Sequence, residues 1–513
     1  MTVTIAAGFL SRAVTSPRRD ALVLSGDPER RWGYEELRRG AVAVGHALRA
    51  EFGAAPPPEV RIAVLLGSGG EFLEIFHGAA LAGIPVMVLD PAWSPAELSS
   101  VLRDAPPVRL FCGTATEAVR RCVPDGSVVE SSAYEDWLGR YGGRAAADEV
   151  AAFADVPDGA PFYVPFTSGS AGRPKGVVRS HRSWLRSFDR TAVEFGIDGT
   201  DRVLLPGSLA HSHFLYGAVN ALHVGATVHL MPEFDAELAL GLLDRHAVTR
   251  LYVVPTIVEA LLAAARRRPG RSFPGVRSLL SVGAKWSPDR RARAGELFPR
   301  ADTVEFYGAT ELSLVSLLHG DGDGPRESVG RPVAGVELSL RGPSGAEVGV
   351  NEVGRVYVRS DMLFTGYLSR SDAGAPDRDG WFSVGDMGRL DERGYLHLVG
   401  RDGGMLISGG LNVYPEEVEA ALLRLEEVAE AAVVGVPDEH WGEVVCAVVR
   451  WRDGARLDLA GIRDRTAAHV SRQKCPRRVF EVAGLPHTSS GKVDRVRIRG
   501  ALLEGAPGVR EIA

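Results

Sequence analysis

The sequence predicts an α/β protein: a large N-terminal domain of two doubly wound α/β subdomains plus a β-barrel-like subdomain, followed by a small α+β C-terminal domain. Three patterns predict this fold. Strand-like apolar runs alternate with helix-like segments over residues 61–89 and again over residues 202–306, which is typical of parallel sheets covered by helices on both faces. From about residue 328 short alternating strands are separated by glycine turns. Residues after about 401 mix helix and strand again.

The elements of the two α/β subdomains follow from local periodicity. Residues 1–60 favour helices, because apolar residues from Trp32 onward recur at helical spacing. A helix at residues 71–82 and another at 236–246 are expected between strands at residues 61–66, 84–89, 202–205, 226–230, 250–254, 277–282 and 303–306. Because strand–helix–strand connections are right-handed, each set is expected to form a parallel sheet.

The last third of the chain changes pattern. Residues 336–340 and 355–359 alternate apolar and polar side chains, as antiparallel strands do. Beyond them we expect a helix at 415–425 and strands at 431–436 and 443–450. For a chain of 513 residues, more than one core is the rule. We therefore place a large domain at residues 1–400 and a small domain at residues 405–513.

Composition excludes several classes of function. With 45% hydrophobic and 24% charged residues the chain resembles ordinary globular proteins, and its net charge of −6 argues against nucleic acid as the main partner. The four cysteines contain no C-x-x-C pair, which argues against a zinc site or a disulfide scaffold and favours the cytoplasm. No run of 18 apolar residues exists, so no membrane span is expected. Composition does not determine the oligomeric state, and both a monomer and a homodimer are compatible with it.

The most informative stretch is TSGSAGRPKG at residues 167–176, here named the phosphate loop. Glycines let backbone N–H groups turn toward one point and the hydroxyl side chains add donors, which suits a polyphosphate. The loop is not a Walker loop, because Lys175 is followed by Gly176 and not by Ser or Thr. From composition alone, an ordinary flexible turn is the alternative interpretation.

Three further segments place polar residues where chemistry could use them. YGATE at residues 307–311 follows a strand, and Glu311 there suits Mg²⁺, whereas the alternative is a helix start capped by Thr310. Asp386 lies between glycines and suits the hydroxyls of a ribose, or else caps its own turn. Lys492 lies at the tip of a Ser/Gly turn, where a solvated loop lysine is the alternative.

Together these segments resemble the adenylate-forming superfamily of acyl-CoA synthetases, peptide-synthetase adenylation domains and luciferases. The phosphate loop is similar to the family's T-S-G-[ST]-T-G-x-P-K-G signature, residues 307–311 to Y-G-x-T-E, the segment around Asp386 to [ST]-G-D, and residues 485–492 to L-P-x-T-x-x-G-K. The matches cover about residues 30–500 in the family order. Motifs in register over that length make coincidence negligible.

The resemblance implies a role for each matched residue. ATP contacts are implied for Thr167, Ser168, Gly169, Ser170, Gly172, Lys175, Gly283, Ala284, Lys285, Tyr307, Gly308, Thr310, Asp386, Arg401 and Lys492. The implied catalytic residues are Thr310 at the α-phosphate, Glu311 as the Mg²⁺ ligand, and Lys492, which bridges the carboxylate and the α-phosphate. The acyl pocket is implied at His211, Phe214 and Ala309, and the CoA tunnel at Ser408, Gly409 and Gly410. The resemblance also implies a hinge at residues 401–404, at Gly403, which makes the small C-terminal domain mobile. Core packing is an equally good interpretation of His211. An ordinary interdomain linker is an equally good interpretation of the glycine-rich hinge segment.

Two departures from the family pattern concern the expected site. Ala171 stands where relatives usually carry Thr or Ser, so one phosphate-facing hydroxyl is missing. Gly403 stands where relatives usually carry Asp or Lys, so a charged latch is missing at the hinge while the backbone freedom that a hinge uses is kept.

The resemblance implies an ATP- and Mg²⁺-dependent acyl-CoA synthetase that forms an acyl-adenylate, releases pyrophosphate and passes the acyl group to CoA. An acyl carrier protein or an amine is the alternative acceptor. A non-catalytic nucleotide-binding protein is a third interpretation, which the retention of Lys492, Asp386 and Glu311 disfavours. Residues 207–217 contain no acid that could hold an α-ammonium group, so a small-molecule fatty or aryl acid is the expected substrate.

Overall fold

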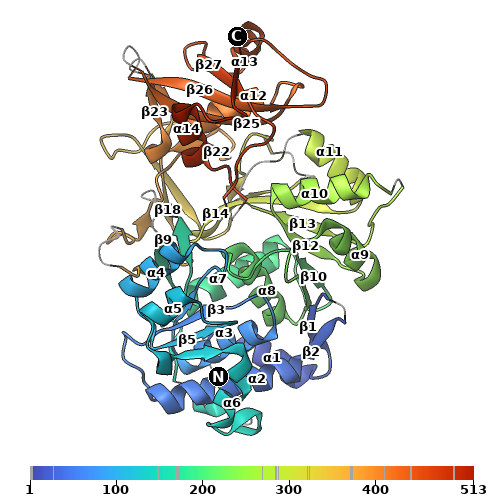
Figure 1. Ribbon diagram of the computed structural model, residues 1–513, viewed down its shortest axis with the longest axis vertical. Helices are drawn as coiled ribbons and strands as arrows, with labels where there is room; N and C mark the ends of the chain where they lie inside the picture. The colour runs from blue at the N-terminus through green and yellow to red at the C-terminus, as the bar shows by residue number, and fades with distance from the viewer. Residues whose placement is uncertain are drawn as a thin grey trace. The chain divides into compact units, whose positions relative to one another are not determined.

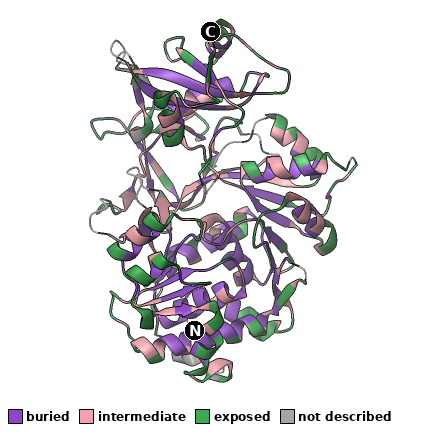
Figure 2. Ribbon diagram, viewed as in Figure 1, coloured by how far each residue is buried: buried purple, intermediate pink, exposed green. Residues whose placement is uncertain are grey.

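The computed structural model describes residues 4–26, 28–146, 150–153, 155–168, 174–268, 270–282, 286, 288–320, 322, 324–369, 374–408, 411–438, 442–488 and 491–512. The chain divides into two compact units. The first unit comprises residues 1–325, 329–337 and 358–382, and the second comprises residues 326–328, 338–357 and 383–513. Figure 1 labels the elements and colours them along the chain, and Figure 2 shows that the sheets of the first unit consist mostly of buried residues.

One sheet of the first unit has the order β19–β9–β7–β4–β3–β5–β6, with β8 paired to β9. Its strands are β3 (Ile62–Leu65), β4 (Val86–Val88), β5 (Arg109–Cys112), β6 (Val128–Glu130), β7 (Pro161–Val164), β8 (Phe166–Ser168), β9 (Pro174–Ser180) and β19 (Gly366–Tyr367). Strands β3 to β7 are parallel, and β9 and β19 are antiparallel additions at one edge. The strands expected at residues 61–66 and 84–89 are confirmed as β3 and β4.

The second sheet of this unit has the order β16–β15–β14–β13–β12–β10–β11–β1–β2. Its strands are β1 (Asp20–Leu24), β2 (Arg30–Gly33), β10 (Arg202–Leu205), β11 (Thr227–Leu230), β12 (Arg250–Val253), β13 (Ser278–Ser281), β14 (Asp302–Ala309), β15 (Ser313–Leu318) and β16 (Arg331–Pro332). The strands from β1 through β11, β10, β12 and β13 to β14 are parallel, and those from β10 to β14 are the strands that the sequence predicted.

The expectation that residues 1–60 are helical is wrong in one part. Strands β1 and β2 form an antiparallel hairpin, and β1 pairs in parallel with β11. The physical reason is that β1 contributes a short apolar run, Ala21 to Val23, which is buried on the sheet, whereas β2 begins with two exposed arginines. A single strand this short gives almost no periodic signal in the sequence.

Helices surround the two sheets. They are α1 (Ala7–Thr15), α2 (Tyr34–Phe52), α3 (Gly70–Ala82), α4 (Pro95–Asp104), α5 (Glu117–Cys122), α6 (Tyr134–Gly139), α7 (His181–Glu194), α8 (Ser212–Val224), α9 (Ala236–His246), α10 (Pro255–Ala265) and α11 (Pro288–Leu297). Helix α3 is buried along almost its whole length and packs on α2 and on strands β3, β4 and β7. The helices expected at residues 71–82 and 236–246 are confirmed as α3 and α9.

The second unit contains a six-stranded sheet of order β24–β23–β26–β27–β28, with β25 paired to β26. Its strands are β23 (Leu406–Ser408), β24 (Leu411–Val413), β25 (Val428–Asp438), β26 (Gly442–Trp451), β27 (Arg478–Glu481) and β28 (Arg510–Ile512), and its helices are α12 (Pro415–Leu422), α13 (Leu459–Thr466) and α14 (Arg495–Glu504). Two apolar clusters, one around Val433 and Val445 and the other around Val434 and Cys446, form the cores on the two faces of this sheet.

An antiparallel sheet precedes this α+β region in the sequence. Its order is β17–β18–β21–β22, with β20 paired to β18, and its strands are β17 (Glu337–Arg341), β18 (Gly354–Arg359), β20 (Trp381–Phe382), β21 (Asp386–Leu390) and β22 (Leu396–Arg401). This is the expected third set of short strands. By compactness β21 and β22 belong with the C-terminal region, so the division falls near residue 383. The functional division at residues 401–404, where the chain forms the short turn η5 (Asp402–Gly404), stays a prediction.

The four cysteines are free thiols, and three of them, Cys112, Cys446 and Cys475, are buried. Burial raises the pKa of the Cys112 and Cys446 thiols to about 11 and also raises the pKa of Cys475. Within the described part of the chain, no helix is long and apolar enough to cross a bilayer.

The contact between α2 and α3 generates a prediction about stability. A Cβ atom added at Gly78 would lie 2.5 Å from the backbone oxygen of Ala41 and from the Val44 side chain. We expect Gly78→Ala to lower the thermal unfolding midpoint, because overpacking a core contact costs about 1–3 kcal/mol while the helix preference for alanine returns only about 1 kcal/mol.

Gly241, in the interior of α9, is the matched control. A Cβ there meets nothing within 4 Å, so Gly241→Ala is expected to leave the midpoint unchanged or raise it. A Gly78→Ala midpoint equal to or above the Gly241→Ala midpoint would contradict the close-packing account.

Candidate active site

The phosphate loop is flanked by the two strands of a hairpin. Thr167 pairs with Lys175 and Ser168 with Pro174 across β8 and β9. The pairing brings the Thr167 and Lys175 ends of the loop side by side. The predicted ATP contacts at Gly169, Ser170 and Gly172 lie outside the described residues, as does Ala171.

Residues 307–311 lie at the end of β14, where parallel strands of the second sheet present their carboxyl ends. Gly308 is required here for a packing reason. A β-bulge separates Tyr307 from Gly308 in the pairing with β15, and a Cβ at Gly308 would lie 2.1 Å from the backbone oxygen of Ser313. The helix-cap alternative for Thr310 is wrong, because the chain turns directly from residues 310–312 into strand β15.

Glu311 is held in a defined position although it is charged. Only 7% of the residue is exposed. Its Oε1 accepts a hydrogen bond of 3.0 Å from the Tyr367 hydroxyl, and its backbone oxygen accepts one of 2.9 Å from the Phe364 amide. Among the described residues no group bonds to Oε2, so this oxygen is available to a ligand. A single carboxylate suits Mg²⁺, which is usually bound by one or two carboxylates together with water and phosphate oxygens.

Tyr367 connects the two predicted phosphate-binding elements. It belongs to β19, which pairs with β9, and the Lys175 ammonium lies 5.5 Å from the centre of its ring. One side of Tyr367 therefore contacts the cation of the phosphate loop while its hydroxyl contacts Glu311. The sequence prediction missed Tyr367, since nothing near it in the sequence indicates a site.

Arg179 is a second residue that the sequence prediction missed. Only 1% of it is exposed, and it is the largest fully buried side chain among the described residues. Its guanidinium donates to the Thr310 backbone oxygen at 2.6 Å, to the Ser313 hydroxyl at 2.5 Å and to the Met362 backbone oxygen at 2.6 Å. Burial lowers the pKa of Arg179 to about 10, so the group remains a cation at neutral pH. It joins the strand after the phosphate loop to the turn that carries Thr310 and Glu311.

The segment between β13 and α11 carries the predicted contacts Gly283, Ala284 and Lys285, which lie outside the described residues. The described residue that follows them is fixed. The Trp286 amide donates to Glu305 at 3.0 Å, and its indole N–H donates to the Ser281 hydroxyl at 2.8 Å. These contacts hold Trp286 at the carboxyl end of β13 and against the middle of β14.

The predicted acyl pocket lies around the start of α8. His211 is the residue before the helix, and its backbone oxygen accepts from Phe214 and Leu215. Phe214 is buried, and a Cβ at Gly207 would lie 2.1 Å from its ring. Core packing of a histidine does occur here, but at His213. Its Nε2 lies 3.2 Å from the Val253 backbone oxygen, and burial lowers its pKa to about 3. Ala309 is partly exposed at the end of β14.

The remaining predicted residues belong to the second unit. Asp386 and Arg401 are cross-strand partners in β21 and β22, with Oδ1 and Nε 2.7 Å apart. Asp386 is almost fully buried while the Arg401 side chain is 60% exposed. The amide of the adjacent Gly385 donates to the Ser383 hydroxyl at 3.1 Å, so Ser383 supplies a cap to this turn.

Lys492 is exposed on a tight turn near the C-terminus. The Thr488 amide donates to the Lys492 backbone oxygen at 2.7 Å, and the Lys492 amide lies 3.3 Å from the Thr488 hydroxyl. Gly491 has a φ of +77°, in the region that favours glycine. Ser408 ends strand β23 and is buried, whereas Gly409 and Gly410 lie outside the described residues.

Comparison with known proteins agrees with this geometry. The family model described as "AMP-binding enzyme" matches residues 9–368, and the one described as "AMP-binding enzyme C-terminal domain" matches residues 417–492. The chain belongs to the AMP-binding enzyme family. The uncharacterized acyl-CoA ligase YhfT of Bacillus subtilis is 36% identical to it over 509 residues, covering 98% of this chain and 99% of that protein.

Two further proteins are similar to this AMP-binding enzyme, one in sequence and one in structure. The indoleacetate–CoA ligase of Aromatoleum aromaticum is 31% identical, with 92% of this chain and 93% of that protein covered. The crystal structure of ATP-bound MatB from Rhodopseudomonas palustris superposes with a TM-score of 0.85 at 26% identity, covering 98% of this chain and 99% of that one. The predicted fold class is thereby confirmed over nearly the whole chain.

The contact between Tyr367 and Glu311 gives a prediction about nucleotide binding. We expect Tyr367→Phe to raise the KM for MgATP by about tenfold, because a hydrogen bond to a charged group contributes about 1.5–3 kcal/mol. The aromatic ring, and with it the contact to Lys175, is kept. Steady-state kinetics at several Mg²⁺ concentrations are the measurement, and Tyr357→Phe is the control in the same chain. An unchanged KM would show that the hydroxyl does not position Glu311.

Arg179 gives a second prediction. We expect Arg179→Lys to lower the rate of pyrophosphate release by about 10- to 100-fold, because an ammonium cannot span the separate carbonyl and hydroxyl acceptors that the planar guanidinium reaches. The exposed Arg182, whose side chain pairs with Asp158, serves as control in Arg182→Lys. Circular dichroism establishes whether Arg179→Lys is folded, and a folded variant of full activity would contradict the positioning role.

Proposed function

We propose that this chain is an AMP-forming acid–thiol ligase, which activates a fatty or aryl carboxylic acid with MgATP and transfers the acyl group to CoA. The observation that carries the proposal is the arrangement around Tyr367. Its hydroxyl contacts the buried Glu311 carboxylate, and its ring contacts the Lys175 ammonium of the phosphate loop. The Tyr367 side chain thus contacts both a cation suited to phosphate oxygens, Lys175, and a carboxylate suited to Mg²⁺, Glu311. Family membership supports the same reaction.

In the first half-reaction the carboxylate oxygen of the acid forms a bond to the α-phosphorus of ATP. The bond from that phosphorus to the oxygen bridging to the β-phosphate breaks, and pyrophosphate leaves with the electron pair. Both reactants are anions, so positioning and charge stabilisation are the main tasks of the protein. We assign Thr310 to the α-phosphate, Lys175 to the departing phosphates and Lys492 to the approaching carboxylate. A bound Mg²⁺ neutralises phosphate charge, and Glu311 is the residue that would hold it.

In the second half-reaction the CoA thiol loses its proton and its sulfur bonds to the acyl carbonyl carbon. The mixed anhydride breaks at the acyl carbon–oxygen bond, and AMP leaves. We assign Ser408, Gly409 and Gly410 to the pantetheine path, and Asp386 with Arg401 to the ribose of the nucleotide. A rotation at Gly403 would exchange the residues presented to the adenylate between the two half-reactions.

The proposed substrate is an acid without an α-amino group. The turn at residues 207–213 and the start of α8 offer the apolar Phe214 and the neutral His213, and no acid occurs in residues 207–217. An α-ammonium group would therefore lack a counter-charge there. An aryl side chain is supported by the similarity to a protein named for indoleacetate.

The test of the proposal is an ATP–pyrophosphate exchange screen over fatty, aryl and amino acids, followed by thioester formation with free CoA. Exchange with a fatty or aryl acid and a CoA thioester as product is the expected result. Exchange without formation of a CoA thioester would indicate that the acyl acceptor is a carrier protein or an amine and not CoA. The absence of exchange with every acid would overturn the ligase proposal.

Lys492 gives the prediction that separates the two half-reactions. We expect Lys492→Ala to lower pyrophosphate release by orders of magnitude, because the lysine offsets the repulsion between two anions. Thioester formation from supplied acyl-adenylate is expected to survive, since that step needs no such charge. Lys474→Ala, which removes a lysine paired with Glu417 in the same unit, is the control. Equal loss of both half-reactions would contradict the assignment.

A further inference from the structure

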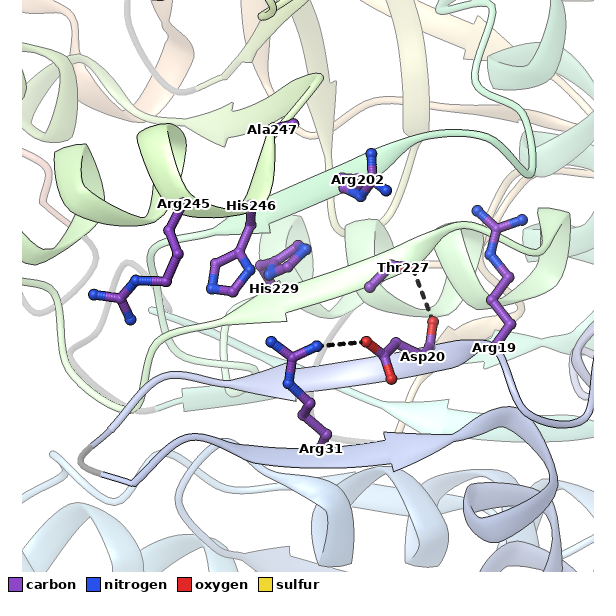
Figure 3. A pocket seen from close by; sticks show the side chains of 9 residues that line it. All are labelled: Arg19, Asp20, Arg31, Arg202, Thr227, His229, Arg245, His246 and Ala247. Atoms are coloured by element: carbon purple, nitrogen blue, oxygen red, sulfur yellow. Dashed lines mark hydrogen bonds and ion pairs between the residues drawn. The ribbon is translucent and has the colours of Figure 1, made fainter.

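A pocket of about 430 Å³ lies on the face of the second sheet, away from the candidate active site. Figure 3 shows side chains from β1, β2, β10 and β11 directed into it, together with the last residues of α9. Its wall is predominantly basic. Its charged and ionisable residues are one acid, Asp20, and the basic side chains of Arg19, Arg31, Arg202, His229, Arg245 and His246.

The position of the pocket separates it from the ligase chemistry. Arg202 is the first residue of β10 and Thr227 the first of β11, and the two are paired in register. The turn at residues 207–211 and the start of α8 follow the opposite end of β10. Four residues of strand, roughly 13 Å at about 3.3 Å per residue, lie between the two ends. The pocket is therefore a second site, and the inference drawn from it does not rest on the proposed function.

The positive charge of the pocket is only partly compensated. Arg31 pairs with Asp20 at 2.7 Å and with Glu29 at 3.1 Å, and Arg245 pairs with Glu29 at 3.0 Å. Arg19 and Arg202 make no ion pair with any described residue. Two guanidinium groups thus face the pocket without a counter-ion among the residues that the structure describes, in a chain whose net charge is −6. Clustered like charges repel one another, so an anion bound among them stabilises the folded state.

His229 supplies an independent observation. Only 3% of this residue is exposed, and within the described part of the chain neither ring nitrogen has a hydrogen-bond partner. Its ring packs 4.7 Å from the ring of His246, which bonds to Glu29 at 2.7 Å. Burial lowers the pKa of His229 to about 3, and the neighbouring His246, Arg202 and Arg31 act in the same direction. The imidazole is therefore neutral and carries one N–H without an acceptor, which is rare for a buried donor.

We propose that this pocket binds a phosphate group, either free inorganic phosphate or the phosphate of a small phosphomonoester. A phosphate dianion matches the two uncompensated charges of Arg19 and Arg202, and guanidinium groups bind phosphate oxygens in pairs of parallel hydrogen bonds. The volume exceeds what phosphate alone fills and lies in the range of small-molecule sites, which leaves room for the group esterified to it. A small displacement of the His246 ring, which packs on His229, would let a phosphate oxygen accept the hydrogen bond from the His229 ring N–H.

The test uses the full-length protein labelled with ¹⁵N and ¹³C in histidine only. The imidazole signals of His229 and His246 are assigned from His229→Gln and His246→Gln and followed while inorganic phosphate or AMP is added. We expect saturable shifts of both signals at millimolar ligand or below. A response to phosphate assigns the free ion, and a response to AMP at lower concentration assigns a phosphomonoester. These signals are local to the pocket, so nucleotide bound in the candidate active site is distinguished from ligand bound here.

The double variant Arg19→Gln/Arg202→Gln is expected to weaken the binding tenfold or more, because two hydrogen-bonded cations are lost. Arg18→Gln, which removes an exposed arginine adjacent in sequence, is the control and should bind as the unmodified chain does. Shifts that persist undiminished in the double variant would overturn the proposal. So would a wild-type chain that shows no shift with either ligand, and so would association with phosphatidylglycerol vesicles in place of a saturable response to phosphate.

Discussion

The buried guanidinium of Arg179 is the constraint on which the arrangement of the candidate active site depends. A cation with 1% exposure is tolerated only when its donors are satisfied. Besides the Ser183 hydroxyl in α7, its acceptors are the backbone oxygens of Thr310 and Met362 and the hydroxyl of Ser313, which come from two separate segments. Satisfying Arg179 therefore fixes those segments against β9. Removing the cation would leave several buried acceptors without donors at once.

This constraint explains other features of the same region. Ser313 has a φ of +59°, which is uncommon for a residue other than glycine, and its hydroxyl bonds to Arg179. Across the bulge, the backbone of Ser313 lies so close to Gly308 that a side chain at position 308 would not fit. The segment that contains Met362 then leads to Phe364, whose amide bonds to the Glu311 backbone, and to Tyr367. The proposed Mg²⁺ ligand, Glu311, is thus positioned through main-chain contacts as well as through its own carboxylate.

The sequence predicted the parallel sheets, most strand positions and the strand end that leads into the turn at Thr310 and Glu311. These features are local, since each depends on residues within a few positions of one another. Arg179 and Tyr367 were not predictable in the same way. Arg179 meets Thr310 across 131 positions and Met362 across 183, and Tyr367 meets Glu311 across 56. Contacts over such separations are set by the packing of whole elements.

Histidines illustrate the same limit. The family motif indicated His211, with core packing as an open alternative, but the histidine here that packs against aromatic rings is His213, two residues later. Alternation along a helix start cannot decide which of two nearby histidines turns inward. The hairpin of β1 and β2 was missed for a related reason, because its stability comes from pairing with β11, about 200 residues away.

The buried cysteines have a consequence for an enzyme that makes thioesters. Acyl-adenylates and acyl-CoA products react with any accessible thiolate, and the thiolate rather than the thiol is the nucleophile. With the pKa of Cys112 and Cys446 raised to about 11, only about one molecule in ten thousand would carry either thiolate at neutral pH. Burial therefore lowers the reactivity of these sulfur atoms toward acyl-adenylates and acyl-CoA, which limits acylation of the protein itself during turnover.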